Sequence, residues 1–235
     1  MGNKRFIFTN LLPENLEKKR EIFKPEKDLI LLKYNDVFWK KIFPIKKDTR
    51  VNNYQLSNIG SYSILYPNDA VKVSEIIKSF LPNKSTITDA NANMGGATLT
   101  FSDYFDHVNS VEIIPFHCKI LENNIKNYDA KNVTVYCNDY LDVGNKLEQD
   151  AIFFDPPWGG PDYKKKIIMN LYLDGISISK IIKSLIDKKK VKIVALRVPI
   201  NYDFKQILEL TNESFTYCFK KPDGRLNFFL IILKV

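Results

Sequence analysis

The sequence has few of the residues that build metal centres and disulfide frameworks. It holds three cysteines, Cys118, Cys137 and Cys218, and two histidines, His107 and His117. No CxxC pair occurs and the histidines stand far from other metal ligands, so we expect no metal site. Three scattered cysteines predict free thiols rather than a disulfide framework. Free thiols are typical of a reducing intracellular compartment, the nucleus or the cytoplasm, or those of the host cell if the protein is viral.

Long apolar runs are missing as well. The longest, Phe228 to Leu233, has six residues, whereas a membrane-spanning helix needs about 20. The opening MGNKRF has the glycine of a myristoylation motif but carries Phe6 where that motif requires Ser or Thr. No signal peptide is recognisable. We therefore expect a protein without a membrane partner. We also expect it to be a monomer.

Basic charge, in contrast, is plentiful and unevenly placed. The net charge of the 235 residues is +8, and residues 1–50 hold 13 basic and 7 acidic side chains. Such a concentrated basic segment indicates a polyanionic partner, because lysine and arginine neutralise phosphates and release counterions. The alternative is a lysine-rich surface that is merely solvated.

Hydrophobic periodicity divides the chain into two parts. Residues 1–55 predict a small, basic, helical extension, with one helix after Leu12 and another over residues 28–43. Residues 56–235 predict a single larger domain in which strands alternate with helices. The expected strands are 86–91, 107–113, 133–139, 151–155, 191–198, 214–221 and 226–234, and the expected helices are 69–81, 96–105, 116–128, 175–187 and 203–211.

This alternation predicts an α/β fold with a doubly wound, mostly parallel, seven-stranded sheet. The last two strands are joined by KPDGR at 221–225, whose Asp223-Gly224 pair is a strong hairpin signal. The sheet should therefore end in an antiparallel hairpin. Five parallel strands followed by such a hairpin resemble the Rossmann-like architecture of class I methyltransferases, although an architecture does not by itself specify a function.

The turn after the first strand has the composition of a ligand-binding loop. Asp89 ends the strand TITD, and small residues lead from there to Gly95 and Gly96. Glycines let backbone N–H groups approach a ligand, and Asn93 is of the residue type that best tolerates a left-handed conformation after glycine. A plain structural turn is the alternative.

Acidic residues stand at the ends of the next two strands. Ligands of doubly wound sheets bind at the carboxyl ends of strands. Glu112 is therefore placed to accept hydrogen bonds from ribose hydroxyls, and Asp139 to accept one from an adenine amino group. Capping of the following helix is the alternative for both acids, and Asp142 could share that capping role.

The stretch DPPW, Asp155 to Trp158, follows the fourth strand. The prolines fix φ and remove two backbone donors, so nearby carbonyl groups remain as acceptors. Asp155 and the Pro156 carbonyl can then hold the two hydrogens of a planar NH₂ group, and Trp158 offers a flat face on which a base can stack. The stretch predicts a site for methylating an exocyclic amine of a base. A tight turn without chemistry is the alternative.

These residues resemble a known family. DPPW matches the amino-methyltransferase signature, and PPWGGPDY, Pro156 to Tyr163, closely resembles trimethylguanosine synthases, RNA cap guanine-N2 methyltransferases. DANANMGG (89–96) is similar to their DAFCGVGG, VEIIPFHCKILENN (111–124) to their acidic strand end and Asn-Asn helix, and CNDY (137–140) to their Gly-Asp-Phe turn. LKYNDVFWKKIF, residues 32–43, resembles the helix before their catalytic domain.

Four features depart from the family. Asp155 stands where the family usually has serine, and aspartate at this position is the form found in adenine amino-methyltransferases. Asn93 stands where the family has glycine. The family's Phe-Ser-Val-Thr-Pro box is replaced by SILYP at 63–67, and its Leu-Pro-Arg-Asn by LRVPIN at 196–201.

The resemblance implies a function and a set of site residues. The chain would transfer a methyl group from S-adenosylmethionine to the 2-amino group of a 7-methylguanosine RNA cap, giving di- or trimethylguanosine, with capped RNA as its partner. The implied catalytic residues are Asp155, Pro156 and Trp158; those for the cofactor are Asp89, Asn93, Gly95, Gly96, Glu112, Asp139 and Asp155; those for the cap are Trp158, Tyr163, Lys33, Arg197 and Asn201.

Two rival functions remain open. One is an amino-methyltransferase that acts on internal guanine or adenine of RNA or DNA. The other is a catalytically inactive, RNA-binding subunit that keeps the methyltransferase fold.

Overall fold

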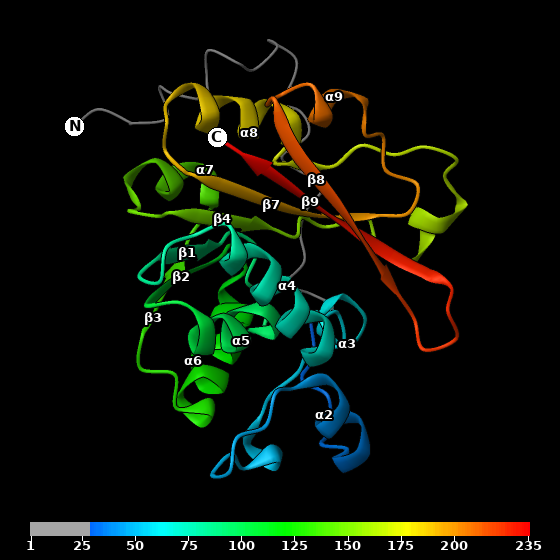
Figure 1. Ribbon diagram of the computed structural model, residues 1–235. Helices are drawn as coiled ribbons and strands as arrows, with labels where there is room; N and C mark the ends of the chain where they lie inside the picture. Colours follow the sequence, from blue (N-terminus) through cyan, green and yellow to red (C-terminus); the bar gives the residue numbers. More distant parts are fainter. Residues whose placement is uncertain (1–28) are drawn as a thin grey trace, which may run out of the picture.

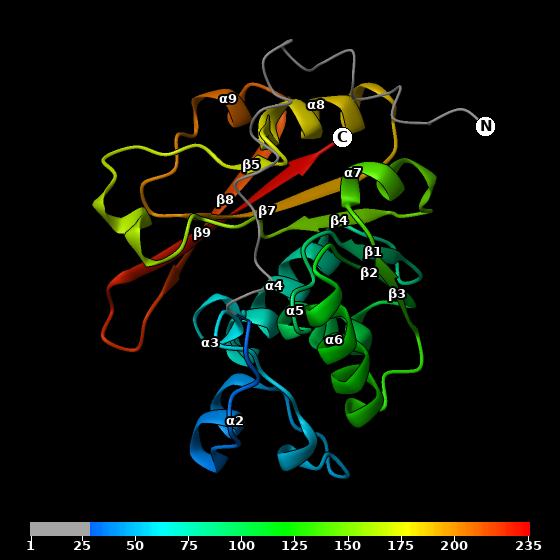
Figure 2. The ribbon, with the colours of Figure 1, turned by 180° about the vertical axis from the view of Figure 1, so that it is seen from behind.

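The computed structural model describes residues 29–235, which form a layered α/β structure around a seven-stranded sheet (Figure 1). The helices α4, α5 and α6 lie on one side of the sheet and α7, α8 and α9 on the other (Figures 1 and 2). Two hydrophobic clusters fill the two interfaces between sheet and helices. The predicted α/β fold, doubly wound and mostly parallel with a C-terminal antiparallel hairpin, is confirmed.

The order of the strands across the sheet is β3-β2-β1-β4-β7-β9-β8. The strands are β1 Thr86–Asp89, β2 His107–Glu112, β3 Val133–Cys137, β4 Ala151–Phe154, β7 Ile193–Pro199, β8 Glu213–Lys220 and β9 Leu226–Lys234; β5 Tyr172–Leu173 and β6 Ile176–Ser177 form a separate ribbon. The chain order reverses between β1 and β4, and such a switch point is where doubly wound sheets bind ligands.

The helices expected over 69–81, 96–105, 116–128 and 175–187 are present with small shifts of their ends, whereas the one expected over 203–211 is a single turn. The helices are α2 Asp36–Ile42, α3 Gly60–Ser63, α4 Pro67–Ser79, α5 Gly96–Tyr104, α6 Pro115–Tyr128, α7 Tyr140–Val143, α8 Ile178–Asp187 and α9 Lys205–Leu208, with short 3₁₀ segments η3 Val51–Asn53, η4 Gly144–Lys146 and η5 Pro161–Lys165. The helix expected over 28–43 is shorter than predicted, because Asn35 caps α2 by accepting from the Phe38 amide. The helix expected after Leu12 lies outside the described residues.

Residues 29–55 pack against α6 and the turn after β1 through a third hydrophobic cluster. Trp39 is buried there, and its Nε1 donates to the Tyr54 carbonyl at 2.9 Å. The buried amide of Asn124 on α6 joins two segments: its Oδ1 accepts from the Gln55 amide at 2.8 Å, and its Nδ2 donates to the carbonyls of Gln55 and Met94. Because Met94 lies in the turn after β1, Asn124 links the N-terminal segment to that turn.

The prediction of three free thiols is wrong for two of them. Cys118 on α6 and Cys137 at the end of β3 form a disulfide, with Cα atoms 5.7 Å apart. The hydrophobic face of α6 lies against β3, so residues 19 positions apart meet across that contact. Cys218 is free and exposed. The argument from free thiols to a reducing compartment therefore loses the support of this pair.

Residues 29–235 were found to contain neither a membrane-spanning helix nor a metal-binding cluster. Within that range, no helix is both long enough and apolar enough to span a membrane. No group of three or more His, Cys, Asp or Glu side chains in the same range is placed to hold a metal ion.

Candidate active site

The turn between β1 and α5 is shaped by glycine and asparagine. Asn93 has φ 51°, the left-handed conformation that the sequence predicts for it, and Gly95 has φ 97°. A Cβ on Gly96 would lie 2.8 Å from the Leu65 carbonyl oxygen and 2.5 Å from the Ile64 side chain. Any larger residue would therefore displace the segment before α4. The turn brings its backbone close to residues 63–65, and Asn93 Nδ2 donates to Ser63 Oγ at 2.7 Å.

Buried polar atoms without partners gather at the carboxyl ends of the strands. Among residues 29–235, ten buried side-chain N or O atoms lack a hydrogen-bond partner. Six of them belong to residues that follow or end β1, β4 and β7: Asp89 Oδ1, Asn91 Oδ1, Asn93 Oδ1, Trp158 Nε1, Arg197 Nε and Asn201 Oδ1. Buried polar groups are nearly always paired in folded proteins. This concentration indicates a site that a polar ligand completes.

The surroundings of Asp89 shift its pKa strongly. Its side chain is 1% exposed, and Oδ2 accepts a hydrogen bond from Thr98 Oγ1 at 2.7 Å. Burial raises the pKa of Asp89 to about 7; the hydrogen bond from Thr98 opposes that shift, and the charge of Asp155 adds to it. A carboxyl group with this pKa gains its charge near neutral pH, and a cationic ligand would favour the charged form.

We expect the binding of S-adenosylmethionine to depend on pH through Asp89. If the ionised carboxylate binds the positively charged methionine end, Kd should fall by up to about tenfold between about pH 6 and about pH 8, because the group loses its proton in that window. Calorimetry at a series of pH values measures this dependence. In Asp89→Asn the dependence should disappear and the affinity should be low throughout.

Thr98→Val provides the matched variant for that experiment. Removing the hydroxyl takes away a hydrogen bond that lowers the pKa of Asp89, so the midpoint of the affinity curve should move to higher pH. The prediction that Asp89 binds the cofactor would be wrong if the affinity of the parent protein did not change with pH. It would also be wrong if Asp89→Asn showed the same pH dependence as the parent.

Glu112 is buried at the end of β2 and ties three segments together. Its Oε2 accepts from the Asn93 amide at 2.8 Å and its Oε1 from the Ile114 amide at 2.9 Å. His117 Nδ1 lies 3.8 Å from Oε1, and His117 Nε2 is 3.1 Å from Ser57 Oγ. Each carboxylate oxygen can accept a second hydrogen bond. Glu112 therefore keeps acceptor capacity for a ligand while it fixes the turn after β1.

Asp139 takes the capping position that the sequence left as an alternative. It is the N-cap of α7, and its Oδ1 accepts from the Leu141 amide at 2.9 Å. Asp142 lies in the first turn of the same helix and donates its backbone amide to the Asp139 carbonyl. A contact between Asp139 and adenine stays a prediction.

The Asp-Pro-Pro-Trp corner contains a buried ion pair. The register of β4 and β7 pairs Phe154 with Leu196, so the next residues, Asp155 and Arg197, come together. Arg197 Nη1 donates to Asp155 Oδ2 at 2.6 Å, and the two side chains are only 12% and 15% exposed. Burial raises the pKa of Asp155, and the charge and hydrogen bond of Arg197 oppose that shift. Arg197 therefore favours the ionised form of the carboxyl group.

Arg197 also lies over two aromatic rings. Its guanidinium carbon lies 4.7 Å from the centroid of the Trp158 ring and 4.5 Å from that of Phe228. Trp158 is half-buried, and it packs on the rims of the two clusters that flank the sheet. Tyr163 approaches it edge-on, with ring centroids 5.1 Å apart. Asp155, Trp158, Tyr163 and Arg197 thus form one contiguous group.

The remaining candidates for cap binding are placed differently. Asn201 uses its amide within the chain, since Nδ2 donates to the carbonyls of Tyr163 at 3.0 Å and Lys166 at 2.7 Å. Lys33 is exposed in the segment that pairs with residues 56–58 through the Leu31–Ser57 bridge, and no described contact brings it to the Asp155 corner.

Four polar or aromatic residues of this region are not identifiable from the sequence motifs: Ser63, Thr98, His117 and Phe228. Thr98 could have been suspected, since it follows Gly96 by two residues and so faces the end of β1 from the first turn of α5. The contacts of Ser63 with Asn93, His117 with Ser57 and Phe228 with Arg197 join residues far apart in the chain, and no local pattern marks them.

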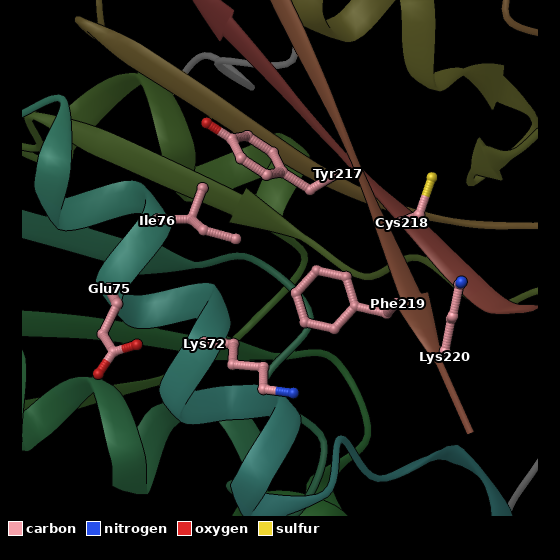
Figure 3. A pocket seen from close by; sticks show the side chains of 7 residues that line it. All are labelled: Lys72, Glu75, Ile76, Tyr217, Cys218, Phe219 and Lys220. Carbon is pink, nitrogen blue, oxygen red and sulfur yellow. The ribbon is translucent and has the colours of Figure 1, made fainter. Parts of the chain in front are cut away.

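A cavity of about 440 Å³ lies outside this group, between α4 and β8. Its lining includes Lys72 and Ile76 on α4 and Tyr217 and Phe219 on β8, and it includes none of the predicted site residues. Tyr217 and Phe219 point toward α4, whereas Cys218 points to the other side of the strand (Figure 3). The cavity is therefore a groove beside the edge strand, separate from the Asp155 corner.

Comparison with known proteins identifies the family. Residues 84–230, more than half of the chain, match the family model for RNA cap guanine-N2 methyltransferases. This range contains β1 to β4, the turn after β1 and the Asp-Pro-Pro-Trp corner.

Several proteins are similar in sequence. An uncharacterised protein, L320, of Acanthamoeba polyphaga mimivirus is 33% identical over 188 residues, covering 69% of this chain and 73% of its own. The trimethylguanosine synthases of Saccharomyces cerevisiae and Schizosaccharomyces pombe are 25% and 30% identical, over 83% and 47% of this chain. The matched parts span 62% and 48% of those two yeast proteins.

Solved structures support the fold. A precorrin-6y C5,15-methyltransferase of Geobacter metallireducens matches with a TM-score of 0.53 and 14% identity, covering 74% of this chain and 91% of its own. An O-methyltransferase of Bacillus cereus in complex with SAH matches with a TM-score of 0.52 and 13% identity, covering 74% and 84%. Fold and family together imply S-adenosylmethionine as the methyl donor. The chain has the Rossmann-like fold of class I methyltransferases and belongs to the RNA cap guanine-N2 methyltransferase family.

Proposed function

We propose that this protein transfers a methyl group from S-adenosylmethionine to the exocyclic 2-amino group of a 7-methylguanosine RNA cap. The observation that carries the proposal is the contiguous group Asp155, Trp158, Tyr163 and Arg197 beside the switch point of the sheet. The family match and the similarity to two yeast trimethylguanosine synthases support the choice of a cap.

The residues around the turn after β1 fit the methyl donor. Asp89, Asn91 and Asn93 each present a buried oxygen without a partner, and such acceptors suit the ammonium group at the methionine end. Glu112 would hold the ribose, and Asp139 the adenine. When bound, the donor supplies an electrophilic methyl group on a sulfonium. The backbone around Gly95 and Gly96 would bring that end close to the chain and exclude water.

Asp155 would orient the amine of the base. Arg197 holds one carboxylate oxygen, Oδ2, which leaves Oδ1 as the acceptor for an amine hydrogen, with the Pro156 carbonyl as the second acceptor. An exocyclic amine is a poor nucleophile because its lone pair is delocalised into the ring, and holding both hydrogens directs that lone pair toward the methyl group. Positive charge then develops on the nitrogen, and the nearby carboxylate stabilises it in a site with little water.

Trp158 would select the methylated cap. Arg197 lies over the indole, and the Tyr163 ring is roughly perpendicular to it. The other face would stack on the base, and a 7-methylguanine ring is cationic, which adds a cation–π attraction absent for unmodified guanine. One aromatic side chain would in this way distinguish a capped 5′ end from internal guanines.

A panel of acceptors tests the proposal. The protein is incubated with methyl-labelled S-adenosylmethionine and 7-methyl-GDP, GDP, capped RNA or uncapped RNA. Label should enter 7-methyl-GDP and capped RNA alone, and nuclease digestion of the product should place it on the 2-amino group. The number of methyl groups on that nitrogen distinguishes mono- from dimethylation.

Asp155 itself favours a second candidate, because an aspartate at this position resembles adenine amino-methyltransferases. Adding RNA and DNA with internal adenine or guanine to the panel tests it. If label entered uncapped RNA or DNA but not 7-methyl-GDP, the protein would be an amino-methyltransferase of internal bases and the cap proposal would be wrong. Calorimetry that detects no binding of S-adenosylmethionine would point instead to an inactive RNA-binding subunit.

A further inference from the structure

A loop that leaves the Asp155 corner carries unusual exposed side chains. We call residues 163–168, Tyr163 followed by Lys-Lys-Lys-Ile-Ile, the lysine strap. All three lysines are exposed, and Ile167 and Ile168 are 92% and 65% exposed. Exposed isoleucines in pairs are uncommon on a free surface, and next to a functional site they indicate a contact with a partner molecule.

The lysine strap is fixed to the site at both ends. At its start, Tyr163 lies edge-on against Trp158. The amide of Asn201 spans the strap, donating to the carbonyls of Tyr163 and Lys166. Just beyond its end, the Met169 amide donates to the Asn201 carbonyl at 2.9 Å. A ligand that stacks on Trp158 therefore emerges beside a positioned row of lysines.

The charges of the lysine strap are available to a ligand. Lys164 Nζ lies 5.7 Å from the Tyr163 ring centroid, close to the aromatic pair. Lys165 pairs with Asp162 at 2.7 Å, but the two side chains are 80% and 78% exposed. An ion pair with that exposure contributes little, so a phosphate can replace the carboxylate at small cost.

We propose that the lysine strap binds the sugar–phosphate backbone of the RNA nucleotides that follow the cap. This inference rests on the proposed function for its choice of a capped strand, since a cap on Trp158 would lie next to Tyr163, where the strap begins. Three adjacent lysines match successive phosphates, and the isoleucines beside them offer apolar cover for ribose or base faces. A protein partner is less consistent with three like charges in a row.

A second run of three lysines provides a matched control. Lys188, Lys189 and Lys190 follow α8 and precede β7, so they lie at the amino end of that strand, whereas Arg197 and Asn201 mark its carboxyl end. Seven residues of strand separate the two ends by roughly 20 Å. The triple variants Lys164→Gln/Lys165→Gln/Lys166→Gln and Lys188→Gln/Lys189→Gln/Lys190→Gln change the net charge equally.

The test measures RNA binding as well as methylation. A fluorescent capped RNA of about ten nucleotides is titrated with each protein at several salt concentrations, and anisotropy gives Kd. The strap variant should bind about 10- to 100-fold more weakly, and the slope of log K against log salt should fall by about 2, because three phosphate contacts on a single strand are lost. The control variant should stay within about twofold. The kcat/KM of the control variant on capped RNA should also stay within about twofold of the parent value. The kcat/KM of the strap variant should fall further on capped RNA than on 7-methyl-GDP.

The outcomes separate this proposal from the function on which it rests. Equal melting temperatures exclude unfolding as the cause of weak binding. The proposal would be overturned if the strap variant bound RNA as tightly as the parent, or if both triple variants lost the same affinity. Unchanged RNA binding by the strap variant would indicate that the exposed isoleucines contact a protein instead. Weakened binding by the strap variant alone supports it, even if the parent protein fails to methylate 7-methyl-GDP, a failure that would count against the cap function only.

Discussion

Replacing Asp155 with alanine should lower kcat for methyl transfer to 7-methyl-GDP by about 10²–10³-fold, the usual effect of removing a group that stabilises developing charge. The carboxylate suits that role because Arg197 engages Oδ2, which leaves Oδ1 as the acceptor for an amine hydrogen in the proposed reaction. Kd for S-adenosylmethionine should change by less than about threefold, since we propose that the methionine and ribose contacts come from the ends of β1 and β2. Single-turnover kinetics at saturating substrates and calorimetry measure the two quantities.

Stability has to be followed alongside, because the pair is buried. Without Asp155 the Arg197 guanidinium, 12% exposed, has no carboxylate partner, and losing one member of a buried pair costs about 3–5 kcal/mol of unfolding free energy. Asp155→Ser, which introduces the residue usual in the family, meets the same penalty. A thermal melt identifies the temperature at which every variant is folded.

Asp162→Ala is the matched control for Asp155→Ala. This carboxylate lies on the same turn but is 78% exposed, so its removal should leave both turnover and melting temperature near those of the parent. Turnover by Asp155→Ala within threefold of the parent, in folded protein, would take Asp155 out of the chemistry.

The sheet could be read from the sequence because its strands are short apolar runs separated by helices of strong periodicity. AIFF at 151–154 is buried at every position, which is typical of a parallel strand covered on both faces. The hairpin followed from Asp223-Gly224, and β8 and β9 pair on either side of it. These are local signals, and local signals also placed the turn after β1 and the Asp-Pro-Pro-Trp corner at strand ends.

The contacts that complete the site are not local. Asp155 and Arg197 are 42 positions apart and meet only because β4 and β7 pair in a particular register. The resemblance implied a contact with the cap for Arg197, and no local pattern marks its pairing with Asp155. The disulfide was missed for the same reason, as Cys118 and Cys137 belong to a helix and the following strand.

Trp158→Ala should weaken the binding of 7-methyl-GDP by about 10²–10³-fold, combining the loss of base stacking with the loss of cation–π attraction. Kd for S-adenosylmethionine should hardly change. GDP, whose base is uncharged, should lose less than 7-methyl-GDP, so the preference for the methylated cap should shrink. Fluorescence or calorimetric titration with both nucleotides gives these values.

The surroundings of Trp158 make this test specific. Arg197 keeps its contact with Phe228, 4.5 Å away, when the indole is removed, so the Asp155–Arg197 pair should persist and kcat at saturating cap should fall far less than the affinity. Trp158→Phe retains a ring and should recover most of the binding, while Tyr172→Ala, an exposed aromatic on β5, should have no effect. If Trp158→Ala weakened both ligands equally, the indole would be supporting the fold of the corner, and cap recognition would have to come from another side chain.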